Sequence, residues 1–203
     1  MAHTPLHLIY ITGLGDHKVG GQQKAVQLWN RYGVSAELFQ VRWADREPWE
    51  PKFERLLNLI DQHIAEGKHV ALVGASAGAS AVINAYAARK DKIVGTVLLA
   101  GKVNRAHAIG GSYRSQNPAF ITSAENSQHA LKTLGKDQRR RTQSRYGIID
   151  EIVPFTDSVI KGARNRVVPT VGHIPTIALQ LIFPWGFIRF LKRQARQFES
   201  ASA

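Results

Sequence analysis

Short hydrophobic runs alternate with segments of helical periodicity along the chain. The first run, Leu6–Thr12, ends at Gly13-Leu14-Gly15, a pattern typical of a buried strand followed by a tight turn. Between residues 52 and 66, apolar residues recur at steps of three and four, as they do on one face of a helix. The predicted strands are Leu6–Thr12, Ser35–Val41, His69–Val73, Ile93–Ala100, Arg145–Ile149 and Arg166–Val168, and the predicted helices are Val19–Tyr32, Lys52–Glu66, 78–88, Ser123–Leu134 and a last one within His173–Phe198 that breaks at Pro184–Gly186.

This alternation predicts βαβ units, and therefore a parallel sheet covered by helices on both faces. No repeat or low-complexity tract divides the chain, so we expect one α/β domain over residues 1–203. Residues 102–144 form the one long interruption, and such excursions between sheet elements are usually functional or mobile. We predict a small lid-like insertion there, whose apolar underside would hold Tyr113, Phe120, Ile121, Leu131 and Leu134.

Ser76 stands at the centre of Gly74-Ala75-Ser76-Ala77-Gly78, between a hydrophobic strand and a helix rich in small residues. A serine on so sharp a turn has a strained backbone, and side chains two positions away on either side would collide with it. The N-terminus of the helix also directs its partial positive charge at the serine oxygen. The pattern favours a nucleophile. A helix start that merely packs tightly on the sheet would have the same glycines.

Two later segments make a likeness to a known family specific. Tyr146–Pro154 is similar to a strand of that family that ends in Asp followed by Val-Pro, and Val171-Gly172-His173 follows the last predicted strand. Together with the motif around Ser76, they make the chain resemble the α/β-hydrolase superfamily over nearly its whole length. The resemblance implies a mostly parallel sheet of about six strands in the order 2-1-3-4-5-6, without the two N-terminal strands of the full fold. It also implies Ser76 as nucleophile, Asp150 as acid and His173 as base.

These residue types suit acyl transfer to a serine. A serine hydroxyl is a poor nucleophile until a base takes its proton, and an imidazole does this near neutral pH. A carboxylate holds the imidazole in the required tautomer and stabilises the imidazolium. By resemblance, the backbone N–H groups of Leu14 and Ala77 form the oxyanion hole. The resemblance therefore implies a serine hydrolase that cleaves a small-molecule carboxylic ester of short or medium acyl chain through an acyl-enzyme, without cofactor or metal. Thioester or amide hydrolysis and acyl transfer would use the same groups.

Other assignments of the acid and the base stay open at this point. Asp157 follows Asp150 by seven residues, although it also has the pattern of a helix N-cap, and Glu151 is adjacent to Asp150. His173 would cap the last helix if it is not the base. Asp16 follows Leu14 by two residues, and its carboxylate would oppose an oxyanion there. We expect Asp16 to be turned away or paired, with His17 or Lys18 as the nearest partners.

Trp43 and Trp49 follow the second predicted strand at its carboxyl end, the edge where open α/β sheets bind ligands. One interpretation places their rings in the wall of an acyl pocket. The other interpretation, packing between the loop and the next helix, is favoured by the pattern.

Charge adds a second class of function. The chain has 27 Lys and Arg against 15 Asp and Glu, a formal net charge of +12, and residues 102–203 hold +10 of it. The densest basic segment, 136–145, has no interleaved aromatic residues for stacking on bases, so we expect no nucleic-acid partner. The alternative to the enzyme is a catalytically inactive hydrolase fold that binds an anionic membrane or polymer. The chain has no cysteine, which excludes a disulfide scaffold and a thiol nucleophile.

The last predicted helix is unusually apolar, and Phe183–Arg196 combines aromatic residues with cations. Packing on the sheet explains this composition. An alternative is peripheral contact with an anionic membrane, with aromatic rings at the lipid boundary and cations at the headgroups. Met1–His7 carries no Lys or Arg, and no apolar stretch is long enough to span a bilayer. We therefore expect a cytoplasmic protein that is membrane-peripheral if this segment binds lipid.

Overall fold

In the computed structural model, which describes residues 4–202, six strands form one sheet in the order β2-β1-β3-β4-β5-β6. All five neighbouring pairs are parallel, as the sequence predicts. The strands are β1 (Leu6–Ile11), β2 (Ser35–Phe39), β3 (His69–Ala75), β4 (Ile93–Leu99), β5 (Thr142–Ile149) and β6 (Arg164–Val171). The helices are α1 (Gly20–Gln27), η1 (Leu28–Tyr32), α2 (Trp49–Ala65), α3 (Gly78–Ala88), η2 (Ala106–Ala108), α4 (Gly111–Gln116), α5 (Pro118–Thr133), α6 (Lys136–Arg140), α7 (Phe155–Ser158), α8 (His173–Ile182) and α9 (Trp185–Ser202).

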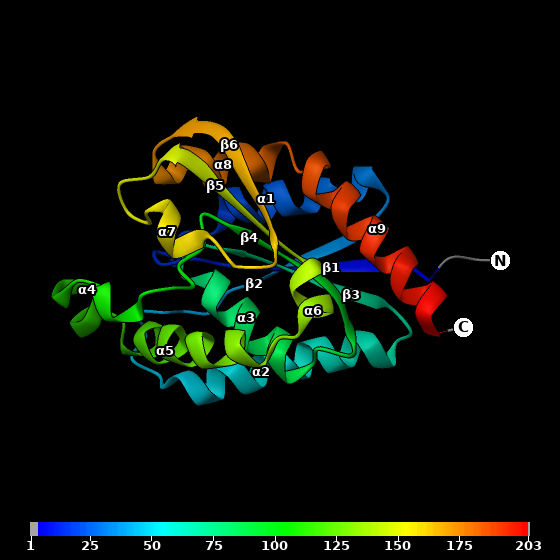
Figure 1. Cartoon of the computed structure of the whole chain (residues 1–203). Coiled ribbons are helices and arrows are strands. Elements are labelled where there is room, and N and C mark those ends of the chain that lie inside the picture. Colours follow the sequence, from blue (N-terminus) through cyan, green and yellow to red (C-terminus); the bar gives the residue numbers. More distant parts are fainter. Residues whose placement is uncertain (1–3, 203) are drawn as a thin grey trace.

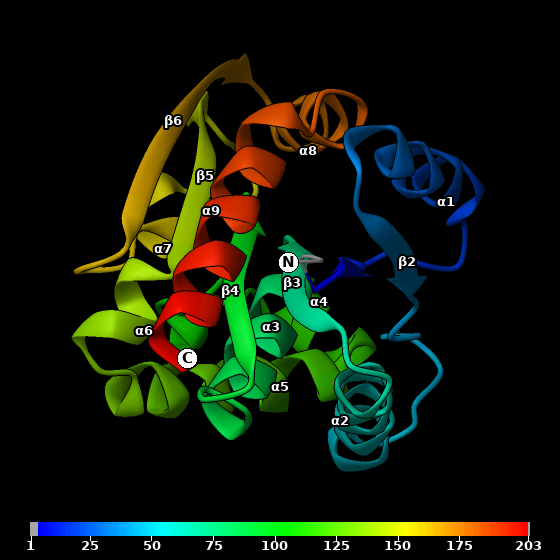
Figure 2. The same cartoon turned by 90° about the vertical axis from the view of Figure 1, so that its right-hand side faces the viewer.

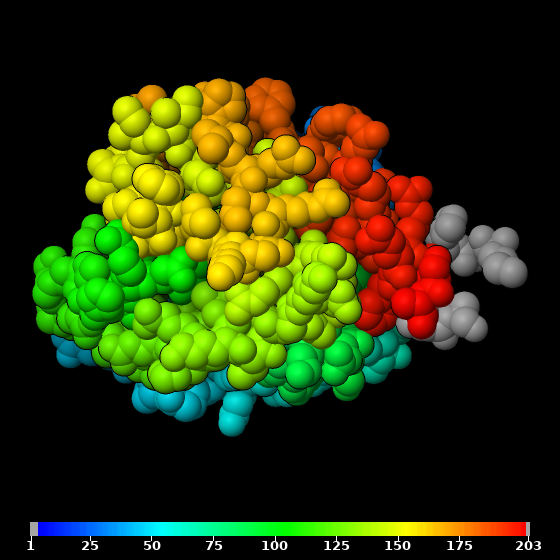
Figure 3. Space-filling view, viewed as in Figure 1, coloured from blue at the N-terminus to red at the C-terminus, as the bar shows by residue number. Residues whose placement is uncertain are grey.

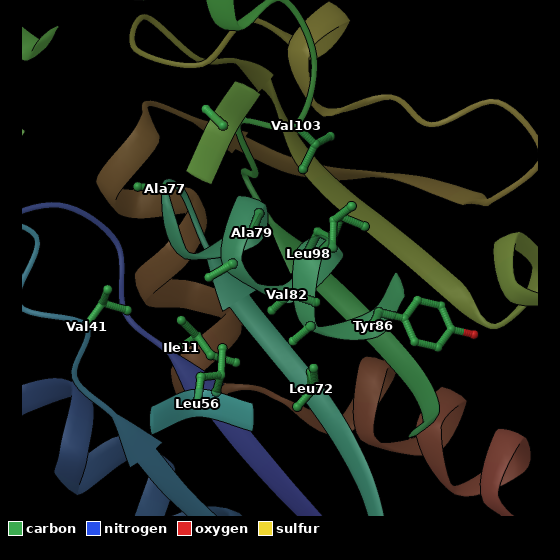
Figure 4. Packing of buried hydrophobic residues seen from close by; sticks show 14 of the residues in the cluster. Ile11, Val41, Leu56, Leu72, Ala77, Ala79, Val82, Tyr86, Leu98 and Val103 are labelled. Atoms are coloured by element: carbon green, nitrogen blue, oxygen red, sulfur yellow. The ribbon is translucent and has the colours of Figure 1, made fainter. Parts of the chain in front are cut away.

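The helices cover both faces of the sheet, as Figure 1 shows, with α2, α3 and α5 on one side and α1, α8 and α9 on the other. Along β1, side chains alternate between two buried clusters: Ile9 and Ile11 face α2 and α3, whereas Leu8 and Tyr10 face α1 and α9. The central strands are therefore buried on both faces and appear in the sequence as continuous apolar runs. Figure 4 shows part of the first cluster, in which Ile11 lies near Leu56 of α2.

The segment predicted as a lid-like insertion divides into two parts. The helix α5 is the crossover between β4 and β5, and it packs on α3 and α2. Leu131 and Leu134 belong to the main core, so the prediction of a lid is wrong for residues 118–140. The reason is that the apolar face of α5 packs against α3 and α2, where it extends the core on that side of the sheet. Residues 102–116 remain as an excursion at the carboxyl ends of the strands.

The last helical segment breaks before Trp185, as predicted, and α8 and α9 meet at a bend of 63°. Figure 2 shows α9 lying along the sheet over β4. Phe187, Phe190 and Leu191 are buried in the second cluster, so packing accounts for most of the apolar stretch 183–196. Within residues 4–202, no single helix has the length and apolarity to cross a bilayer; only the bent pair α8 and α9 passes that test, and only when the two are taken together.

Arginines of the basic segment 136–145 support the fold. Arg139 donates to the carbonyl oxygens of Leu134 and Leu131, and Arg141 donates to the carbonyl of Ile93 at 3.3 Å. These guanidinium groups bind the ends of neighbouring elements, so the segment is less available to an anionic ligand than its composition suggests.

Candidate active site

Ser76 lies on the sharp turn between β3 and α3. Its φ is +51°, a conformation that costs a residue with a side chain about 1–3 kcal/mol. The turn is fixed from two sides, because the Ser76 N–H donates to the Leu99 carbonyl at 2.9 Å and the Lys102 N–H donates to the Ser76 carbonyl at 3.1 Å. A serine held in this conformation projects from the carboxyl edge of the sheet.

The glycines around Ser76 have the steric role that the sequence predicts. A Cβ added to Gly74 would lie 2.6 Å from the carbonyl oxygen of Gly78, and one added to Gly78 would lie 2.4 Å from the carbonyl oxygen of Ile11. Both obstacles are backbone atoms that cannot move aside. The two glycines therefore permit α3 to begin directly against β1 and β3.

His173 and Asp150 form a buried pair at the ends of β5 and β6. The ring Nδ1 of His173 lies 2.8 Å from Oδ2 of Asp150, and the side chains are 4% and 2% exposed. The other carboxylate oxygen of Asp150 accepts hydrogen bonds from the N–H groups of Ile152 at 3.0 Å and Val153 at 2.7 Å. These bonds fix the carboxylate, and the carboxylate in turn fixes the imidazole.

Ser76 and His173 border the same cleft, which has a volume of about 370 Å³. Because Asp150 engages Nδ1, Nε2 is the ring nitrogen that remains for a group in the cleft. Within residues 4–202, no hydrogen bond joins the Ser76 hydroxyl to the ring. Most of the lining is apolar; it includes Leu14, Tyr113, Ile152, Ile174, Ile177 and Leu181.

A smaller cavity of about 100 Å³ also opens at Ser76. The excursion 102–116 supplies much of its wall, through Lys102, Ile109 and Tyr113. In the space-filling view, the green residues of α4 lie beside the yellow residues near 152 at one edge of the molecule (Figure 3). The part of the predicted lid that precedes α5 thus borders the same cavity as Ser76.

The two predicted oxyanion donors flank Ser76. Leu14, in the turn after β1, lines both cavities, and Ala77 is the N-cap residue directly before α3. Across residues 4–202, neither backbone N–H donates to a protein carbonyl. Both amides, together with the N-terminus of α3, are therefore available to a negatively charged oxygen beside Ser76.

Asp16 is paired, but its partners are not the predicted ones. Its Oδ2 accepts hydrogen bonds from the N–H of Arg42 at 2.6 Å and from the Thr12 hydroxyl at 3.0 Å. His17 and Lys18 make no such contact among the described residues. The carboxylate instead links the turn after β1 to the segment that follows β2. Partners that far apart could not be inferred from neighbours in the sequence.

The alternative acids have other roles. Asp157 lies 1% exposed between two cations, Lys102 and Arg105, each of which donates to one of its carboxylate oxygens. Glu151 accepts the backbone N–H of His173 at 3.2 Å and so holds the first residue of α8. Neither carboxylate contacts the imidazole ring. Sequence reasoning missed the pairing of Asp157 with Lys102 and Arg105, and also the bond from the His173 N–H to Glu151. Nothing in the sequence relates the partners to one another.

Trp43 and Trp49 pack in the core, which is the interpretation that the sequence pattern favoured, and the acyl-pocket interpretation is wrong. Their rings are 0% and 3% exposed and stack on each other with centroids 5.7 Å apart. The indole N–H of Trp43 donates to the carbonyl of Thr12 at 3.0 Å. The rings fill the core between β1 and α2 because their large apolar faces are covered completely there.

Similar solved structures include one of the metagenome-derived lipolytic enzymes LipS and LipT, with a TM-score of 0.70 at 10% identity over 93% of this chain and 95% of that one. Est1E from Butyrivibrio proteoclasticus has a TM-score of 0.66 at 19% identity, over 95% and 88% of the two chains. The chain has the α/β-hydrolase fold. Mouse alpha/beta hydrolase domain-containing protein 10 shares this fold with a TM-score of 0.64 at 18% identity, over 94% and 92%. No protein-family model and no curated protein matched the chain.

The α/β-hydrolase fold explains why these residues meet. Parallel strands bring their carboxyl ends to one edge of the sheet, so the ends of β3, β5 and β6 carry Ser76, Asp150 and His173 to the same side.

Within residues 4–202, the one trio of His and acidic side chains spaced to hold a metal ion lies away from this cleft, at His7, Glu37 and His63.

Proposed function

We propose that the chain is a serine hydrolase that cleaves carboxylic esters of short or medium acyl chain through an acyl-enzyme. The observation that carries the proposal is the buried His173–Asp150 pair, which borders the same cleft as Ser76 on its strained turn. Such a serine, with an oriented imidazole and unpaired amides beside it, has the parts that acyl transfer needs. The esterases and lipolytic enzymes among the similar structures add support.

The proposed reaction has two halves. The Ser76 hydroxyl attacks the ester carbonyl while Nε2 of His173 takes its proton, and the amides of Leu14 and Ala77 bind the oxyanion. The imidazolium, stabilised by Asp150, then protonates the leaving alkoxide, so the alcohol departs and the acyl group stays on Ser76. In the second half, His173 takes a proton from water. The hydroxide attacks the acyl carbonyl, the bond to the Ser76 oxygen breaks, and the imidazolium returns its proton to that oxygen as the acid is released.

A chain-length series of nitrophenyl esters tests the function and the depth of the pocket. We expect turnover by the wild type and a loss of about 10⁴-fold or more in kcat for Ser76→Ala, since the nucleophile is gone. A fluorophosphonate probe is expected to label the wild type and not this variant. Ser200→Ala, an exposed serine of α9, serves as the matched control and keeps full activity.

A wild-type protein that is folded but neither turns over esters nor reacts with the probe would contradict this proposal. That result would favour the alternative, an inactive hydrolase fold that binds an anionic membrane or polymer.

An exposed apolar surface next to the cleft supports a peripheral membrane location. Ile174 and Ile182 lie two turns apart on α8 and are 66% and 61% exposed, and Phe183 and Trp185 follow at 66% and 58%. The guanidinium of Arg189 lies 5.3 Å from the centroid of the Trp185 ring. Because Ile174 also lines the cleft, this apolar surface reaches the cleft's mouth. We propose that it contacts an anionic lipid surface; the cytoplasmic location stays a prediction.

Liposome flotation tests this contact. The variant Phe183→Ser/Trp185→Ser is expected to partition about tenfold or more weakly than the wild type into vesicles with anionic headgroups, since two apolar side chains lose their burial. Leu28→Ser, a 48% exposed leucine in η1, is the control and partitions like the wild type. Equal partition of wild type and double variant would end the proposal. Truncation at Phe183 is not a usable test, because it removes the core residues Phe187 and Phe190.

A further inference from the structure

Two histidines and a glutamate meet at the opposite edge of the sheet from Ser76. His7 lies on β1, Glu37 on β2 and His63 in the last turns of α2. Figure 1 shows the start of β1 and the end of α2 toward the same end of the molecule. Nε2 of His7 lies 2.8 Å from Oε1 of Glu37, and Nε2 of His63 contacts the same oxygen. The three donor atoms all lie within 4.8 Å of one another.

The outer nitrogens of both rings have acceptors of their own. Nδ1 of His7 lies 2.7 Å from the hydroxyl of Ser35, and Nδ1 of His63 lies 3.1 Å from Oε2 of Glu66. The imidazole of His7 can therefore carry its proton on Nδ1, which leaves its Nε2 lone pair directed at the position of Glu37. The imidazole of His63 can do the same when Lys68 donates to Glu66 alone. Bonds of this kind to the second nitrogen fix the tautomer and orientation of histidines that bind metals.

Burial and charge are compatible with a cation here. His7 and His63 are 5% and 8% exposed, whereas the Glu37 side chain is 37% exposed and gives access from solvent. Lys68 is the neighbouring cation, but its Nζ lies 2.7 Å from Glu66 and 3.2 Å from Nδ1 of His63, on the outer side of that ring.

We propose that His7, Glu37 and His63 bind a divalent transition metal ion, with Zn²⁺ as the best match. Two imidazole nitrogens and one carboxylate oxygen are ligands that zinc binds at about 2.0–2.2 Å, and water would complete a tetrahedron. Tetrahedral ligands at that range stand roughly 3.3 Å apart, so the exposed Glu37 side chain withdraws slightly as the ion enters. The ion would join β1, β2 and α2 through three side chains far apart in the sequence. Binding of the ion is therefore expected to raise the stability of the fold.

The site is tested on tag-free, chelator-treated full-length protein by titration with zinc sulfate. We expect one zinc ion per chain by calorimetry, and a rise in Tm of about 5 °C when free zinc exceeds Kd by 100-fold. Glu37→Gln removes a ligand with almost no change in shape, and His63→Gln removes a second. Each is expected to weaken zinc binding by at least tenfold. His129→Gln, an exposed histidine of α5, is the control and binds zinc like the wild type.

Cobalt absorption spectra give a readout that does not depend on stability, since tetrahedral Co²⁺ at the site absorbs visible light. Circular dichroism confirms that each variant is folded before titration. The proposal is overturned if the wild type binds no stoichiometric zinc, or if folded Glu37→Gln and His63→Gln bind it as tightly as the wild type. His7, Glu37 and His63 would then form only a hydrogen-bonded cluster, in which two imidazoles share one carboxylate. Ser76→Ala is expected to bind zinc normally, so failure of the hydrolase proposal leaves this one intact.

Discussion

Replacing Asp150 with asparagine is expected to lower kcat for ester hydrolysis by about 10⁴-fold, with little change in the thermal stability of the protein. The amide keeps the shape of the carboxylate, and its oxygen can still accept the N–H groups of Ile152 and Val153. Its NH₂ group, placed 2.8 Å from Nδ1 of His173, would force the imidazole proton onto Nε2. The nitrogen that faces the cleft would then be unable to take a proton from Ser76. Steady-state kinetics with nitrophenyl esters measures the loss.

Glu151→Gln is the matched control for that experiment. Glu151 is the next residue and also contacts His173, but only at the backbone N–H, at 3.2 and 3.3 Å. We expect less than a tenfold change in kcat, because a glutamine oxygen still accepts this bond. A loss in Glu151→Gln as large as that in Asp150→Asn would contradict the assignment of the acid, and so would an unchanged Asp150→Asn.

Replacing Asp157 with alanine is expected to lower the free energy of unfolding by about 3–5 kcal/mol, the usual result of removing one partner of a buried ion pair. The carboxylate is 1% exposed and accepts hydrogen bonds from both Lys102 and Arg105. Without it, the Lys102 ammonium, on a side chain only 9% exposed, has no counter-charge. Urea denaturation followed by circular dichroism measures the change.

Asp137→Ala is the comparison for Asp157→Ala. Asp137 also pairs with an arginine, Arg140, but its side chain is 82% exposed and the charged atoms lie 3.8 Å apart. We expect its free energy of unfolding to stay within about 0.5 kcal/mol of the wild type. Equal, small effects of both substitutions would show that the Lys102–Asp157–Arg105 cluster contributes little to the free energy of unfolding.

Lys102 also borders the smaller cavity at Ser76, so loss of Asp157 is expected to lower kcat as well.

The sequence was sufficient to predict those features that depend on local pattern. Continuous apolar runs indicated strands buried on both faces, and their alternation with helices indicated a parallel sheet. Steric reasoning about Gly74 and Gly78 placed Ser76 on a sharp turn, which the backbone confirms. The predicted pairing of Asp150 with His173 depended on family resemblance, and the structure brings these side chains into contact.

Features that depend on long-range contacts could not be predicted in this way. Lys102 and Asp157 are 55 residues apart, and no periodicity relates them. Trp43 and Trp49 follow a strand at the ligand-binding edge, but whether a ring lines a cleft or fills the core depends on how the next helix packs. Residues 118–140 read as an excursion because the apolar face of α5 has a weak pattern. Its partner face on α3 becomes visible only in three dimensions.

The wholly parallel sheet has a consequence for how the chain folds. Each strand pair joins distant segments: His7 pairs with Ser35, 28 positions away, and even the nearest partners, Gln143 and Arg164, are 21 positions apart. No hairpin can nucleate this sheet, because every pairing must wait for a crossover to close its loop. Folding is expected to be slow for a chain of this size, with unpaired strand edges exposed on the way. Lower temperature during expression should therefore raise the yield of native protein.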